Sequence, residues 1–265
     1  MPSRTVLITG CSAGGIGSAL AEEFHAKGFR VFATARDLSK VAHLKAMGMD
    51  VLDLDIEKSA SIKTAVGAIT ALTGGTLDIL VNNSGLGQAG PIIDSDIEYS
   101  RKMFEVNFFG RMAVTQAFMP LIIKSKGIVL NIGSIAGVCP QPWKGMYNAS
   151  CAAVHHWSDT LRIEMEPFGV RVILVVTGAV RTNFITNQPS VKLVENSIYS
   201  PARESIEAVM TTKAVEKNFV DADIYAQQVV ANVLRSSPEK RQWAGGVAKL
   251  IWLTSAIFWT TAWVS

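Results

Sequence analysis

A glycine-rich segment near the start of the chain has the composition of a phosphate-binding turn. It follows an apolar run, leads into a stretch of helical character and reads Gly10, Cys11, Ser12, Ala13, Gly14, Gly15, Ile16 and Gly17. Glycines allow a tight turn and let backbone N–H groups approach a pyrophosphate, whose charge is favoured at a helix N-terminus. Because this turn opens an alternating α/β chain, we expect a dinucleotide site rather than a purely structural turn.

The residues after the second apolar run indicate which dinucleotide binds. The run ends at Thr34, and Ala35, Arg36 and Asp37 follow it. No acid stands at the end of the run, where a carboxylate would accept the ribose hydroxyls of NAD. The planar fork of Arg36 can instead pair with a 2′-phosphate. NADPH or NADP is therefore the expected cofactor, unless Arg36 is a solvated loop arginine.

Two titratable side chains, Tyr147 and Cys151, lie four positions apart in a predicted helix over residues 146–167. That spacing puts both on one helix face. Their reference pKa values, near 10 and near 8.5, make both groups neutral at neutral pH. A cysteine nucleophile needs an adjacent base, and the sequence assigns none to Cys151.

Alternating strand-length and helix-length segments must position these residues. The apolar runs cover residues 5–9, 30–34, 49–55, 77–82, 127–133 and 170–176. The helical stretches cover 17–27, 59–73, 97–125 and 146–167, and a helix over 221–235 and a strand over 241–243 follow. Apolar strands without alternation are typical of a parallel sheet covered on both faces. We predict one α/β domain over 1–245, with a doubly wound parallel sheet of about seven strands and helices on both faces.

Composition excludes several classes of protein. The 265 residues are 49% hydrophobic and 18% charged, which excludes intrinsic disorder. The net charge is +3 and the basic residues are scattered, so we expect no nucleic-acid partner. The three cysteines form no CxxC pair, which favours a reducing compartment, and no metal site is expected. With no secretory signal visible, we expect a cytoplasmic protein.

Two segments fall outside the alternation. Residues 183–201 form a long stretch without glycine, which we interpret as a substrate lid. Residues 246–265 form an apolar tail that carries Trp252, Trp259 and Trp263 and is diluted by serines and threonines. The tail is compatible with peripheral contact with the cytosolic face of a membrane, with a wall of the substrate site, or with a buried terminal helix. A true membrane span, which needs about 20 strongly apolar residues, is the weakest alternative.

Several motifs recur in the order and spacing of one family. The glycine turn is followed by Asn82-Asn83-Ser84-Gly85, by Asn107, by Ser134 and, thirteen residues later, by Tyr147. Over nearly the whole chain this pattern resembles the short-chain dehydrogenase/reductases. The extra residue in the glycine turn, the run from Ser158 to Arg162 and the apolar tail are most similar to the fungal branch that contains 1-acyldihydroxyacetone-phosphate reductase. The resemblance implies a Rossmann fold, a nicotinamide cofactor and a dimer or tetramer.

The resemblance also implies individual cofactor positions. They lie in the glycine turn, after the strands that follow it, and in the loop after the sixth strand: Gly10, Ser12, Gly15, Ile16, Gly17, Arg36, Asp55, Asn82, Gly85, Gly178, Val180 and Thr182. Among them, Asp55 would hold the adenine amino group, and the last three would hold the nicotinamide. The family usually has proline where this chain has Thr177, so we expect a less rigid loop there.

For catalysis the resemblance implies that Tyr147 exchanges a proton with the substrate, that Ser134 orients the carbonyl oxygen and that Asn107 holds a water. The family's lysine, which acidifies the tyrosine and grips the nicotinamide ribose, is replaced by Cys151. Lowering a tyrosine pKa by about three units requires roughly 4 kcal/mol, which an ammonium supplies and a thiol does not. Redox chemistry should then be slow, shifted to high pH or dependent on another group. Lys144 could lean into the cleft or lie on the surface, and His155 is expected to pack in the core.

We expect an NADPH-dependent carbonyl reductase acting on an apolar ketone or alcohol of lipid or secondary metabolism. The alternative is an enzyme that binds NADP(H) but catalyses a non-redox isomerisation, dehydration or cyclisation in natural-product biosynthesis. Apolar residues on the segments that border the family's substrate cleft support an apolar ligand: Leu86, Ala89, Val138, Trp143, Phe184, Ile185, Leu193, Val194, Ile198 and Tyr199.

Overall fold

The computed structural model describes residues 3–184, 192–210 and 218–257, and a parallel sheet lies at its centre. The strands are β1 (Thr5–Ile8), β2 (Arg30–Ala35), β3 (Asp50–Asp53), β4 (Ile79–Asn82), β5 (Ile128–Ser134), β6 (Arg171–Thr177) and β9 (Arg241–Ala244). Their order in space is β3-β2-β1-β4-β5-β6-β9, and every neighbouring pair is parallel. The order reverses between β1 and β4, which leaves a crevice at the carboxyl ends of these strands.

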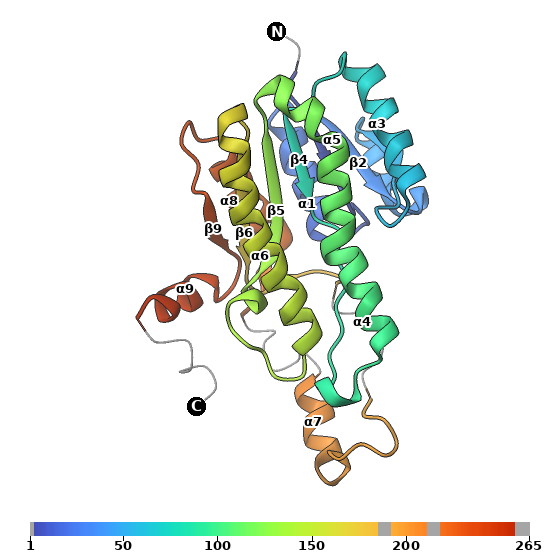
Figure 1. Ribbon diagram of the computed structural model, residues 1–265. Helices are drawn as coiled ribbons and strands as arrows, with labels where there is room; N and C mark the ends of the chain where they lie inside the picture. The colour runs from blue at the N-terminus through green and yellow to red at the C-terminus, as the bar shows by residue number, and fades with distance from the viewer. Residues whose placement is uncertain (1–2, 185–191, 211–217, 258–265) are drawn as a thin grey trace.

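Helices cover both faces of the sheet (Figure 1). One face packs against α1 (Ile16–Ala26) and α8 (Ala222–Val233), and the other against α3 (Ser59–Thr73), α5 (Arg111–Ser125) and α6 (Gly145–Met165). A short α2 (Ala42–Ala46) follows β2. Because both faces are covered, the central strands bury nearly every side chain, which explains their unbroken apolar character, whereas the edge strands β3 and β9 are only partly buried. The predicted seven-stranded, doubly wound sheet is confirmed.

The predicted helix over 97–125 is continuous but not uniform. It consists of α4 (Ile97–Phe104), a π-helical turn (Glu105–Gly110) and α5. Within the described residues this is the one helical stretch long and apolar enough to cross a membrane, and half of its most apolar window is buried inside the protein. Packing against the sheet accounts for that apolar character.

Several elements on the carboxyl side of the sheet were not predicted. They are α7 (Arg203–Met210) and a parallel pair of β7 (Val180–Arg181) with β8 (Val220–Asp221). The helix α9 (Ala248–Ile257) lies in the apolar tail, where a terminal helix was one alternative. Short 3-10 helices span Leu38–Val41, Ile92–Asp94, Ile135–Gly137, Glu166–Phe168 and Ser200–Ala202. In Figure 1, α7 lies beyond the carboxyl end of the sheet, near α4 and α6.

The described part of the apolar tail is an exposed helix. In α9, Leu250, Trp252, Leu253 and Ile257 are between 48% and 65% exposed. The alternative of a buried terminal helix is therefore wrong for these residues. Residues 258–265 of the tail and 185–191 of the predicted lid lie outside the described residues.

Candidate active site

A cavity of about 920 Å³ lies at the carboxyl ends of the strands. Most of the predicted cofactor positions line it: Gly10, Ser12, Gly15, Ile16, Arg36, Asp55, Gly85, Gly178, Val180 and Thr182. The predicted catalytic positions line the same cavity: Asn107, Ser134, Tyr147 and Cys151. The fold thus brings both sets together, while their individual roles stay predictions.

Two predicted cofactor residues, Gly17 and Asn82, lie behind the cavity wall rather than in it. A Cβ on Gly17 would lie 2.4 Å from the carbonyl oxygen of Gly10 and 2.5 Å from Nδ2 of Asn83, so only glycine fits. Asn82 is fully buried, and its Nδ2 donates to Thr115 Oγ1 and Asn131 Oδ1, both at 2.8 Å. Both residues therefore support the glycine turn and the sheet without facing a ligand.

The N-terminus of α1 suits an anion. Gly15 is the N-cap and has no side chain to cap the helix, and Gly15 and Ile16 line the cavity, so the uncapped N–H groups of the first turn are available to an anion there. Asn83 Nδ2 donates to the carbonyl oxygens of Thr9 and Gly10, both at 2.9 Å, and so fixes the turn in front of the helix. A fixed, uncapped helix start beside a long cavity fits the pyrophosphate of a dinucleotide.

Cations gather where the adenine ribose would lie. Arg36 has a side chain that is 59% exposed, and its Nη1 is 3.3 Å from Oε2 of Glu57. Glu57 also pairs with Lys102, with Oε1 and Nζ 3.1 Å apart. Lys40, which sequence reasoning missed, lines the same end of the cavity. A 2′-phosphate here would meet Arg36 and Lys40 and would compete with Glu57 for Arg36.

The aspartates at this end are held by neighbouring residues. Asp37 Oδ1 accepts hydrogen bonds from the backbone N–H and the hydroxyl of Ser39, at 3.0 and 2.7 Å. It therefore caps a turn rather than offering a ribose acceptor. Asp55 lies two residues beyond the end of β3, where the chain turns toward α3. Its backbone N–H donates to Ser61 Oγ at 3.0 Å and holds this turn.

Three side chains meet at the catalytic end. Ser134 is the last residue of β5, and Tyr147 and Cys151 lie in the first turns of α6. All three line the same cavity, and Ser134 lies near enough to Tyr147 to lower its pKa, against the effect of burial. Burial, reinforced by the neighbouring thiol, raises the pKa of Tyr147 far above its usual value. Burial also raises the pKa of Cys151 to about 11. At neutral pH, Tyr147 is therefore a proton donor and Cys151 a neutral thiol.

Asn107 connects this end to the π-helical turn. Its Nδ2 donates to the Leu86 carbonyl at 2.9 Å and to Ser150 Oγ at 3.0 Å, and its Oδ1 accepts from the Leu86 N–H at 2.7 Å. Single π-helical turns are frequent at functional sites because they displace a backbone segment from the helix. Here the turn directs Asn107 toward the start of α6.

His155 supports Ser134 from behind. As expected it is buried, with 4% of its surface exposed, and its Nε2 accepts a long hydrogen bond of 3.4 Å from the backbone N–H of Ser134. Burial, together with the charge of Arg241, lowers the pKa of His155 to about 4. A neutral imidazole can accept this bond, and sequence reasoning missed the contact because His155 lies two helical turns from Tyr147.

The loop after β6 is held where proline was expected. Thr177 Oγ1 and the buried Tyr225 hydroxyl are 2.7 Å apart. The backbone N–H of Gly178 donates to the Ala244 carbonyl, and that of Ala179 to the Gly246 carbonyl, both at 2.8 Å. These bonds anchor the loop in place of the proline ring.

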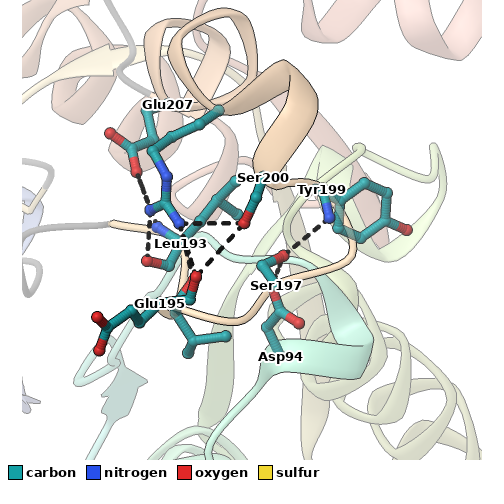
Figure 2. Close-up of polar contacts among 9 residues, drawn as sticks. Asp94, Leu193, Glu195, Ser197, Tyr199, Ser200 and Glu207 are labelled. Carbon is teal, nitrogen blue, oxygen red and sulfur yellow. Dashed lines mark hydrogen bonds and ion pairs between the residues drawn. The ribbon is translucent and has the colours of Figure 1, made fainter.

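The described part of the predicted lid, residues 192–201, is held by polar contacts with neighbouring segments (Figure 2). Arg203, on α7, donates to the carbonyl oxygens of Leu193 and Val194 at 2.8 and 2.9 Å and pairs with Glu207 at 3.2 Å. Ser197 Oγ donates to Asp94 Oδ2 at 2.6 Å, which ties the lid to the segment before α4. Residues 192–201 are therefore held against α7 and the segment before α4, and none of them lines the cavity.

Only some of the residues predicted for the apolar substrate wall line the cavity. Leu86 and Phe184 line the cavity, and the Phe184 ring lies 6.0 Å from that of Tyr147. Leu193 packs inside the lid, whereas Val194 and Ile198 are 49% and 72% exposed. The prediction that Val194 and Ile198 form part of the wall is wrong, because packing against α7 turns these residues toward one another and toward solvent.

Two further cations line the cavity. Lys144 lines the cavity, which was one of the two alternatives predicted for it, and burial lowers its pKa. Arg111, which sequence reasoning missed, is 7% exposed at the start of α5. The signal was present, because Arg111 shares a stripe with Val114, Thr115 and Phe118, spaced as the buried face of a helix.

Known proteins are similar to this chain in sequence and in fold. The family described as short chain dehydrogenase matches residues 4–192. A short-chain dehydrogenase/reductase from Pestalotiopsis microspora is 44% identical over 250 residues, covering 93% of this chain and 86% of its own. A solved short-chain dehydrogenase from Streptomyces avermitilis has a TM-score of 0.84 at 28% identity, covering 97% of this chain and 93% of its own. One from Burkholderia cenocepacia, solved in complex with NADP, has a TM-score of 0.77 at 22% identity, covering 96% and 93%. The chain therefore belongs to the short-chain dehydrogenase family.

Proposed function

We propose that this protein is an NADPH-dependent carbonyl reductase that acts on an apolar ketone of lipid or secondary metabolism. The observation that carries the proposal is that Ser134 and Tyr147 line the same cavity as the glycine turn. A carbonyl oxygen placed between them would accept a hydrogen bond from Ser134 and a proton from Tyr147.

The state of Tyr147 favours reduction over oxidation. Oxidation of an alcohol needs a tyrosinate as base, and burial disfavours that ion because it raises the pKa of Tyr147. Reduction needs the protonated phenol, which is the state present at neutral pH. The chain should therefore reduce ketones over a broad neutral range and oxidise alcohols only at alkaline pH.

Residues of the cofactor end fit NADPH. The first turn of α1 would hold the pyrophosphate, Arg36 and Lys40 the 2′-phosphate, and Gly178, Val180 and Thr182 the nicotinamide. When bound, NADPH supplies the hydride for the carbonyl carbon. The protein's part is to place the carbonyl between Ser134 and Tyr147 and to hold the proton on the Tyr147 oxygen.

The lining near Tyr147 supports an apolar substrate. Leu86, Ile135 and Phe184 line the cavity there, while Gln141 and Lys144 add polar groups. We expect a substrate with an apolar body around the ketone and a polar group that Gln141 or Lys144 can bind.

The test is consumption of NADPH, followed at 340 nm, with a panel of apolar ketones, run beside the same panel without cofactor. The proposal expects NADPH consumption that matches alcohol formation. NADH in place of NADPH is the cofactor control. If no ketone oxidises NADPH, the protein is not a carbonyl reductase of this class.

One observation favours the second candidate, a non-redox isomerase, dehydratase or cyclase. Cys151 stands at the lysine position, so no ammonium there holds the nicotinamide ribose or acidifies Tyr147. A protonated Tyr147 could still serve as a general acid for such a step. Product formation in the assay arm without cofactor would identify this class.

A further inference from the structure

Arg111 carries a buried positive charge that the proposed site does not yet use. Its Nε and Nη2 donate to the carbonyl oxygen of Ser84 at 3.0 and 2.8 Å, and its Nη1 donates to that of Ile132 at 2.6 Å. Among the described residues no acidic side chain forms an ion pair with it. Removing a cation from water without a counterion is costly, so a buried guanidinium paired only with carbonyl oxygens indicates a site for negative charge.

The contacts of Arg111 place this charge at the catalytic end. Ile132 lies two residues before Ser134 on β5. Asn107, one helical turn before Arg111, donates to Ser150, the neighbour of Cys151. A Cβ on Gly85 would lie 3.2 Å from Arg111 Nη2 and 3.4 Å from Asn107 Oδ1, so the two side chains flank one small space.

Arg111 also interacts electrostatically with the two groups of α6 that could become negative, Tyr147 and Cys151. Its charge lowers the pKa of each, against the larger effect of burial. Both groups line the same cavity as Arg111. A tyrosinate at position 147 could thus serve as the counterion of Arg111.

We propose that Arg111 supplies, from α5, the positive charge that the family's lysine would supply from position 151. The inference rests on the proposed reductase. When the ketone is reduced, the O–H bond of Tyr147 breaks and its proton forms the hydroxyl of the alcohol, while the carbonyl carbon gains the hydride of NADPH. A tyrosinate remains until solvent returns a proton, and Arg111 stabilises this anion.

Arg111 acts as a positioning residue in this scheme, because it touches backbone carbonyls rather than the reacting atoms. A guanidinium stays charged at every accessible pH, so its field does not titrate as that of a lysine would. A purely structural Arg111 would only tie the segment after β4 to β5. The two roles differ in one observable, which is the ionisation of the neighbouring groups.

The experiment compares wild type with Arg111→Gln, Arg111→Met and Arg111→Lys, each in a Cys139→Ser background. Of the two remaining thiols, Cys151 lines the cavity and Cys11 is fully buried, so Cys151 is the one that a small reagent entering the cavity can meet. The first readout is the pH dependence of Cys151 alkylation by iodoacetamide, which needs no substrate. The second is the pH dependence of alcohol oxidation, which reports the ionisation of Tyr147. We expect both profiles to move to higher pH by about one unit, a tenfold effect at fixed pH, in the variants without the charge. Arg111→Lys should stay close to wild type.

Profiles that do not move in Arg111→Gln and Arg111→Met would overturn the inference, whatever happens to stability or turnover. If alkylation shifts but no ketone oxidises NADPH, the reductase proposal fails and the electrostatic role of Arg111 stands. If ketones are reduced and neither profile shifts, the reductase stands and the inference fails.

A variant that leaves Arg111 intact covers the case in which neither charge-removing variant folds. Cys151→Lys would place a second cation beside a site that already has one. We expect less than a tenfold gain in turnover at neutral pH. A larger gain would show that the site lacked a cation and would overturn the inference.

Discussion

The two ends of the cavity are built on different principles. The cofactor end is made largely of backbone: the glycine turn, the start of α1 and the loop after β6. The catalytic end is made of side chains from three elements that are far apart in the sequence: Ser134 of β5, Tyr147 of α6 and Arg111 of α5. A backbone site survives substitution as long as its turns survive, whereas a site made of side chains can change its chemistry with a single substitution.

The largest effect should come from Tyr147→Phe, which removes the proton donor and keeps the ring. We expect ketone reduction to fall by about 10²–10⁴-fold, the usual contribution of a positioned general acid. NADPH affinity, measured by fluorescence titration, should change little because the proposed binding residues for the pyrophosphate and the 2′-phosphate do not include Tyr147. Retained turnover would remove Tyr147 from catalysis and break the distinction between the two ends.

The next effect concerns His155 and acid stability. Burial lowers its pKa from 6.5 to about 4, so the unfolded chain binds a proton more readily than the folded one between these values. The contribution of His155 to the free energy of unfolding is therefore fully present above pH 6.5 and is lost as the pH falls to about 4, roughly 3 kcal/mol in all. Urea unfolding at pH 7 and pH 4.5 measures it.

The matched variant is His155→Gln, which keeps an acceptor for the Ser134 N–H and does not titrate. Its stability should fall less than that of wild type between the two pH values. An equal fall in both proteins would mean that other groups cause the acid sensitivity.

At the cofactor end, Arg36→Ala should weaken NADPH binding by about 10–100-fold, the range expected for a charge-assisted pair, and should leave NADH binding nearly unchanged. Glu57→Gln is the opposing variant, because it frees Arg36 from its ion pair. It should tighten NADPH binding slightly. If Arg36→Ala changed the affinities for NADPH and NADH equally, Arg36 would be a solvated loop arginine that does not bind the 2′-phosphate.

The smallest effect concerns the loop after β6. Thr177→Val removes the hydroxyl that contacts buried Tyr225 and should cost about 1–3 kcal/mol of unfolding free energy, since the Tyr225 hydroxyl loses its partner. Tyr225→Phe removes the other partner. The double variant should be less destabilised than the sum of the two single variants. Additive losses would show that the bond does not anchor the loop.

The same contrast explains what could be predicted from sequence. The sheet, its helices and the glycine turn follow from local patterns, so they could be predicted within a few residues. Ser134, Tyr147 and Cys151 were found by motif and spacing. The burial of Arg111 could have been predicted from its place on the apolar stripe of α5, but its place at the cavity could not. That place and the Thr177–Tyr225 pair depend on which helix faces which strand end, and this is a property of the packed molecule. The helix α7 was missed because its residues pack within the lid rather than on the sheet.

The most direct test of the account is transfer of deuterium from NADPH labelled at nicotinamide C4, with both C4 isomers used. In the presence of the wild-type chain and a ketone that it converts, mass spectrometry should find one deuterium on the carbinol carbon of the alcohol with one of the isomers, and far less product with Tyr147→Phe. A product formed at full rate without deuterium from either isomer, or without the dinucleotide, would contradict the account.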